Sequence, residues 1–113
     1  MRNADLYEEK SRIVSALAHP VRLAILDCLA TGPSSAGGLV SALDLPQPLV
    51  SQHLAVLRKA GVVTLARRGS RHIYALADPQ VSTACALMGE IVARLIQAER
   101  TRLAPLARAV VAR

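Results

Sequence analysis

Residues 47–61 read QPLVSQHLAVLRKAG, and this stretch predicts a helix over about residues 47–60 that stops at Gly61. At about 100° per residue, Val50, Leu54 and Leu57 share one side of the helix and form an apolar stripe. The opposite side carries small, amide and basic side chains, namely Pro48, Ser51, Gln52, Ala55 and Lys59. Such a face makes a poor protein core, and its size and hydrogen-bonding groups fit the major groove of DNA.

Three more helices are predicted before this one. Residues 6–17 have an amphipathic pattern that ends at His19-Pro20, and Pro20 is well suited to the first turn of a second helix. The second helix closes at Thr31-Gly32-Pro33, and a short third helix follows Ser34-Ser35, which are candidate N-caps. The third helix and the helix at 47–60 then form a helix-turn-helix.

After Gly61 the spacing of apolar residues changes from a helical period to a period of two residues. Residues 62–76 therefore predict a β-hairpin, and its tip, residues 67–71, carries three arginines. Asp78-Pro79 is a strong helix start, and the apolar pattern beyond it predicts a helix over about 79–103 that stops before Pro105. Such a helix would be ~37 Å long, more than a small domain needs for its own core, so a partner helix is expected.

The composition and the motifs also argue against several other classes of protein. The chain has 113 residues, which predicts one domain over 1–113, and it lacks Phe and Trp, so the core must be built from small aliphatic side chains. No apolar run reaches membrane-spanning length, and the two cysteines, Cys28 and Cys85, are not in a CxxC pattern. No catalytic motif such as GxSxG or HExxH occurs. We expect a cytoplasmic protein that is not an enzyme and does not associate with membranes.

The positive charge is concentrated in the middle of the chain. The net charge is +6, and residues 32–76 hold five basic side chains against Asp44 alone. Residues 1–31 are neutral overall. A basic surface placed around the 47–60 helix and the hairpin indicates a polyanionic partner.

Three blocks, in this order and spacing, resemble the ArsR/SmtB family of winged helix-turn-helix regulators. They are ALAHPVRLAIL at 16–26, QPLVSQHLAVLRKAGVV at 47–63 and RGSRHIYAL at 68–76. The resemblance implies a mainly α fold with a small β-hairpin, and a homodimer formed through the first and last helices. It also implies a repressor that binds an inverted-repeat operator in double-stranded DNA. Pro46 departs from the family, which usually has Ser or Thr there to cap the recognition helix.

If the resemblance holds, the side-chain types predict two groups of DNA contacts, one to base edges and one to the DNA backbone or minor groove. Gln47, Ser51 and Gln52 have side chains that can pair with base edges. Basic side chains suit phosphates or a narrow minor groove, and these are Lys59, Arg67, Arg68 and Arg71. His53 lies beside the apolar stripe, so it is either a phosphate contact or a packing histidine.

The effector is left open. Arsenic and cadmium sensors of the family often use a thiolate pair where this chain has Ser35-Ala36-Gly37, and zinc, cobalt and nickel sensors use a set for which this chain offers Asp78, Gln80, Ile91 and Arg94. Neither set is complete, so we expect no tight thiolate-type binding of arsenite or cadmium. A nickel or zinc ion could bind a non-standard set drawn from His19, Asp5, Glu8, Glu9, Cys28 and Cys85.

Two further alternatives stand beside a metal ion. Cys28 and Cys85 resemble, in placement only, the cysteine pair of sulfide- and persulfide-responsive members, although each could equally be a small core residue. The chain could also be an effector-independent winged-helix protein that binds a second protein.

Overall fold

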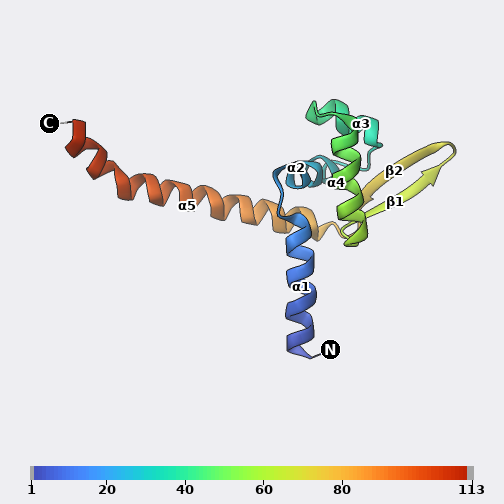
Figure 1. Ribbon diagram of the computed structural model, residues 1–113, viewed down its shortest axis with the longest axis horizontal. Coiled ribbons are helices and arrows are strands. Elements are labelled where there is room, and N and C mark those ends of the chain that lie inside the picture. The colour runs from blue at the N-terminus through green and yellow to red at the C-terminus, as the bar shows by residue number, and fades with distance from the viewer. Residues whose placement is uncertain (1, 112–113) are drawn as a thin grey trace. The chain divides into compact units, whose positions relative to one another are not determined.

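The computed structural model describes residues 2–111, in which five helices and two strands follow one another (Figure 1). The elements are α1 (Asn3–Leu17), α2 (Pro20–Ala30), α3 (Ala36–Leu43), α4 (Gln47–Lys59), β1 (Val63–Arg68), β2 (Arg71–Leu76) and α5 (Gln80–Val111). The expected domain span of 1–113 includes residues 1, 112 and 113, which lie outside the described residues. Contacts divide the described chain into two units, one up to Ser82 and one from Thr83 onward.

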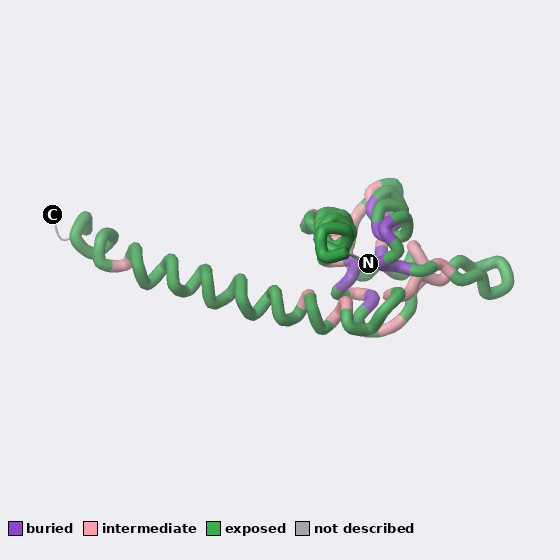
Figure 2. Tube along the Cα trace, turned by 90° about the horizontal axis from the view of Figure 1, so that it is seen from below, coloured by how far each residue is buried: buried purple, intermediate pink, exposed green. Residues whose placement is uncertain are grey.

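The first unit holds the core. Its fully buried side chains are aliphatic, come mainly from α2 and α4, and are Ile25, Leu26, Leu39, Val50, Leu54, Leu57 and Val63. The apolar stripe predicted for residues 47–60 is therefore the buried side of α4, which packs on α2, α3 and β1. Figure 2 shows the buried positions gathered among these elements, while the hairpin tip is exposed.

The helix-turn-helix is α3 followed by α4. Ser35 caps α3 as expected, because its hydroxyl accepts a hydrogen bond from the Gly38 N–H at 3.1 Å. Asp44 ends α3 in the left-handed conformation, with φ of 53°. Pro46 offers α4 no side-chain cap, but its carbonyl accepts from the N–H groups of Leu49 and Val50. Backbone geometry thus takes over part of the task of the missing Ser or Thr.

The wing is a regular antiparallel hairpin. Val63 pairs with Leu76 at its base and Arg68 with Arg71 at its tip, which leaves Gly69-Ser70 as a two-residue turn. Gly69 has φ of +62°, a conformation that favours glycine in such turns. Ser34, just before α3, exchanges two backbone hydrogen bonds with Tyr74 of β2. This bridge attaches the wing to the loop that leads into the helix-turn-helix.

The last helix is longer than predicted. Asp78 accepts from the Gln80 N–H at 2.8 Å, as the Asp78-Pro79 start predicts. The prediction that the helix ends near Leu103 is wrong, because α5 runs through Pro105 to Val111. A proline inside a helix removes one backbone hydrogen bond, and the alanine, leucine and arginine residues on either side are strong helix formers. None of the residues of α5 is buried within the chain.

Candidate nucleic-acid interface

The outward face of α4 is exposed along its length. Gln47, Ser51 and Gln52 are exposed, and so are the small side chains of Pro48 and Ala55 beside them. The three residues predicted to read bases therefore share one accessible surface, and their amide and hydroxyl groups are the types that pair with base edges. This surface stays accessible because the apolar stripe on the opposite side of α4 packs in the core.

Basic side chains are exposed at two further places. Lys59 is exposed at the end of α4, and Arg67, Arg68 and Arg71 are exposed at the tip of the wing. Arg58 is exposed next to Lys59 as well. It belongs to the same basic helix end but was not among the predicted contacts, although the Arg58-Lys59 pair was the signal that could have included it. No acidic side chain lies in residues 45–76.

His53 lies on the other side of α4 from this surface. It is 8% exposed, and its ring centroid is 4.2 Å from that of His19. Burial also lowers its pKa, with smaller contributions from the nearby His19 and Arg22. A buried histidine held neutral in this way supports the packing interpretation, and a phosphate contact does not fit its position.

The metal candidates are not gathered into a site. Within residues 2–111, no three His, Cys, Asp or Glu side chains lie close enough together to hold an ion. His19, moreover, uses Nδ1 to accept a hydrogen bond from the Val21 N–H. The carboxylates Asp5, Glu8 and Glu9 are exposed on α1, and Cys28 and Cys85 are partly exposed on α2 and α5. Nickel or zinc binding by these residues stays a prediction.

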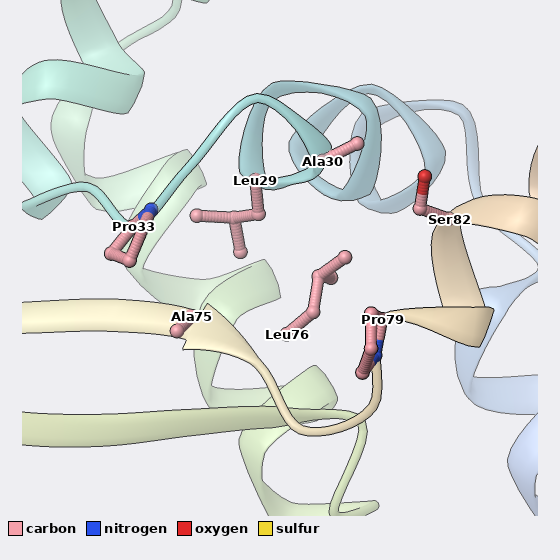
Figure 3. A pocket seen from close by; sticks show the side chains of 7 residues that line it. All are labelled: Leu29, Ala30, Pro33, Ala75, Leu76, Pro79 and Ser82. Carbon is pink, nitrogen blue, oxygen red and sulfur yellow. The ribbon is translucent and has the colours of Figure 1, made fainter.

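A small hollow lies where α2, β2 and the start of α5 meet (Figure 3). Leu29 and Leu76 project into it, and the rest of the lining is Ala30, Pro33, Ala75, Pro79 and Ser82. Its volume is about 280 Å³, and Ser82 contributes the only side-chain polar group of the lining. Sites for small molecules usually combine a larger enclosed volume with several polar groups, so the hollow does not by itself indicate an effector.

Comparison with known sequences places these features in a family. Residues 19–64 match the sequence profile described as "Bacterial regulatory protein, arsR family". The chain is 37% identical over 97 residues to the uncharacterised HTH-type transcriptional regulator Rv0081 of Mycobacterium tuberculosis, which covers 85% of each protein. It is 46% identical over 74 residues to the HTH-type transcriptional repressor SmtB of the same species, which covers 66% of this chain and 55% of SmtB.

Solved structures agree with the sequence relatives. The crystal structure of M. tuberculosis Rv0081 has a TM-score of 0.74 at 37% identity and covers 83% of this chain and 95% of that one. The homodimeric winged helix-turn-helix DNA-binding domain of Mb0332 from Mycobacterium bovis has a TM-score of 0.75 at 30% identity, over 85% and 89%. The fold is therefore that of a winged helix-turn-helix protein. The chain belongs to the arsR family of bacterial regulatory proteins, so it is a DNA-binding transcriptional regulator and not an enzyme.

Proposed function

We propose that the protein is a repressor that acts in the cytoplasm and binds an inverted-repeat operator as a homodimer. The observation that carries this proposal is the pair of exposed surfaces on α4 and the wing: amide and hydroxyl side chains lie on α4, and lysine and arginine lie at the end of α4 and at the wing tip. Gln47, Ser51 and Gln52 would contact bases in the major groove. Phosphate and minor-groove contacts would come from Arg58, Lys59, Arg67, Arg68 and Arg71.

The homodimer is supported by the exposed apolar side chains of α5. They follow helical spacing and include Leu87, Met88, Ile91, Leu95 and Ile96. Leu6 and Val14 of α1 are exposed apolar side chains as well. A second copy of the chain can cover such a stripe with the same stripe, as symmetric interfaces do. The Mb0332 domain, which is homodimeric, supports the same arrangement.

A bilayer is the other environment that could cover α5. By length and mean hydropathy the helix could cross a membrane. Arg94 lies near its midpoint, however, with Glu90 and Glu99 within a turn and a half. Charged groups at the centre of a bilayer cost several kcal/mol in total, whereas at a dimer interface they can stay at the solvated rim. This difference favours the dimer.

Operator binding can be tested with the promoter region of the protein's own gene. We expect a protected footprint with two half-sites about 34–36 Å apart, and an affinity that falls steeply with salt. A scrambled duplex of the same length should bind at least ~10³-fold more weakly at physiological salt. Equal affinity for the two duplexes would contradict the proposal and favour the alternative of a winged-helix protein with a protein partner.

The effector can be sought in the same assay. Nickel, zinc and an oxidant are added separately to the operator complex. Release by nickel or zinc would support a non-standard metal site, and release by the oxidant would support a role for Cys28 and Cys85. Complexes that withstand all three would indicate that neither sensing mode operates.

A further inference from the structure

The second residue of α4 is an exposed proline. Pro48 follows Gln47 in the first turn of the helix. A proline costs the helix no hydrogen bond at this place, because the first N–H groups of a helix have no acceptor within it, and the next two, of Leu49 and Val50, bond to the carbonyl of Pro46. The fixed φ of proline also stiffens the first turn. Pro48 therefore presents a rigid apolar ring at the N-terminal end of α4.

Pro48 lies on the same side of α4 as the residues that we propose to read bases. Four residues span about 6 Å along a helix and about 40° around it, so Pro48 and Gln52 are neighbours on the outward side. Ser51 lies about 60° from Pro48 in the other direction. All three side chains are exposed. Because the N-terminal residues of a recognition helix reach base edges, the ring of Pro48 is placed to enter the major groove together with these side chains.

The side chains of this face suit two of the four bases. The amide of Gln52 can pair with N6 and N7 of adenine, and an apolar side chain can pack on the 5-methyl group of thymine. Guanine is read most often by arginine or lysine, and N4 of cytosine by a carboxylate. Residues 47–57 contain no arginine, lysine, aspartate or glutamate, and Arg58 and Lys59 lie in the last turn of α4. The N-terminal part of α4 is therefore suited to A·T pairs.

Ala55 is another exposed apolar residue on the outward side of α4. It follows Pro48 by about 10 Å along the helix. Because a recognition helix contacts base edges with its N-terminal residues, Ala55 would lie farther from the bases than Pro48 does. Its single methyl group also extends less far than a proline ring. We therefore assign the apolar contact to Pro48.

We propose that Pro48 is a specificity-determining residue that packs on the 5-methyl group of a thymine in each operator half-site, close to an adenine that is hydrogen-bonded to Gln52. This inference deepens the proposed operator binding and rests on it. The 6 Å between the two residues along α4 corresponds to about two base pairs of B-DNA, so the thymine and the adenine lie within about two base pairs of each other. The bases that face α4 in each half-site are then mostly A·T pairs.

The test replaces thymine by uracil in the operator, which removes the 5-methyl group and leaves base pairing unchanged. The operator is first defined by selecting duplexes from a randomised pool and footprinting them. Each protected thymine is then replaced by uracil in turn. At least one position in each half-site should weaken wild-type binding about fourfold, the effect expected for one buried methyl group. Uracil outside the protected half-sites should have no effect.

Pro48→Ala tests which side chain contacts the methyl group. It removes most of the ring and leaves a strong helix former in the first turn. We expect this variant to bind the thymine operator about fourfold more weakly than wild type, and to bind the thymine and uracil operators equally. Gln52→Ala is the matched control on the same face, and it should keep the wild-type ratio of affinities for these two operators. A ratio that is kept in Pro48→Ala would overturn the assignment.

A structural role of Pro48 would change more than the methyl contact. Pro48→Ala should keep the wild-type affinity for scrambled DNA and the wild-type salt dependence, because the basic residues of α4 and the wing are unchanged. Its midpoint of denaturant unfolding should stay close to that of wild type, because the side chain is exposed. If Pro48→Ala binds all duplexes more weakly by the same factor, the ring supports the helix without reading a base, and the inference fails.

The same measurements separate this inference from the proposed function. Wild-type protein that prefers the operator to scrambled DNA, yet responds to uracil at no protected position, would overturn the inference while operator binding stands. Selected half-sites made mainly of G·C pairs would have the same consequence. Equal affinity for operator and scrambled DNA would overturn the proposed function, and this inference with it.

Discussion

α4 and α5 are both amphipathic helices, yet they differ in what covers their apolar sides. The apolar stripe of α4 is buried against α2, α3 and β1, and Leu54 is 1% exposed. No residue of α5 is buried within the chain, and Leu95 is 63% exposed. The same periodicity therefore predicts an amphipathic helix in both cases, but it does not say whether the partner surface lies in the same chain. For α5, the proposed homodimer would supply that surface from a second copy of the chain.

The largest effect on stability is expected for α4, because the surface that covers its apolar side lies in the same chain. Leu54→Ala removes buried aliphatic atoms from the core side of α4 and should lower the free energy of unfolding by about 2–5 kcal/mol. Val56→Ala is the matched control, because Val56 is on the same helix but exposed, and it should change stability by no more than ~1 kcal/mol. Denaturant unfolding at fixed protein concentration measures both. Similar losses for the two variants would mean that the faces of α4 are assigned incorrectly.

A charge on α5 should act on assembly instead. In the proposed homodimer, Ile91→Asp would place two carboxylates in a symmetric interface, so we expect the dimer dissociation constant to rise at least ~30-fold, which corresponds to about 2 kcal/mol. Sedimentation over a range of concentrations measures it. The isolated subunit should keep its helical content, because Ile91 contributes nothing to the core of the first unit. If the wild-type chain is a folded monomer at micromolar concentration, a second copy does not cover the apolar side of α5, and this part of the proposal is contradicted.

A smaller effect is expected from pH. Burial, together with His19 and Arg22, holds the pKa of His53 below its ordinary value, so the folded protein binds this proton less readily than the unfolded chain. The stabilisation is fully present above about pH 6.5 and is lost as the pH falls through that value toward the pKa of the folded state. Thermal unfolding at pH 7.5 and 5.5 should therefore show a smaller drop in stability for His53→Gln than for wild type. Equal drops in stability for the two proteins would show that protonation of His53 does not contribute to the loss of stability in acid.

Much of this architecture could be predicted because local signals determined it. The 100° step assigned the faces of α4 correctly, and Ser35 and Asp78 marked the starts of two helices. His53 could not be placed, because it lies at the edge of the apolar stripe and its burial depends on where α2 packs. The end of α5 does not follow from the sequence pattern, because Pro105 predicts a helix end while the strong helix formers around it carry the helix on to Val111.

The proposed DNA contacts remain predictions for a different physical reason. Exposure shows that a side chain can reach a partner, but base and phosphate contacts depend on how the protein lies on the duplex. Among the described residues, the amide side chains of α4 and the arginines of α4 and the wing are all exposed. Their division into base-reading and backbone-contacting groups rests on residue chemistry, and binding measurements can separate the two groups.

The most direct test of the central claim compares Gln52→Ala with Arg68→Ala on operator and scrambled DNA across a salt series. Gln52→Ala should lower discrimination by about 1–3 kcal/mol and leave the salt dependence unchanged. Arg68→Ala should weaken binding to both duplexes alike and reduce the slope of log affinity against log salt by about one. The same sequence-independent loss in both variants would contradict the assignment of α4 as the helix that reads the operator.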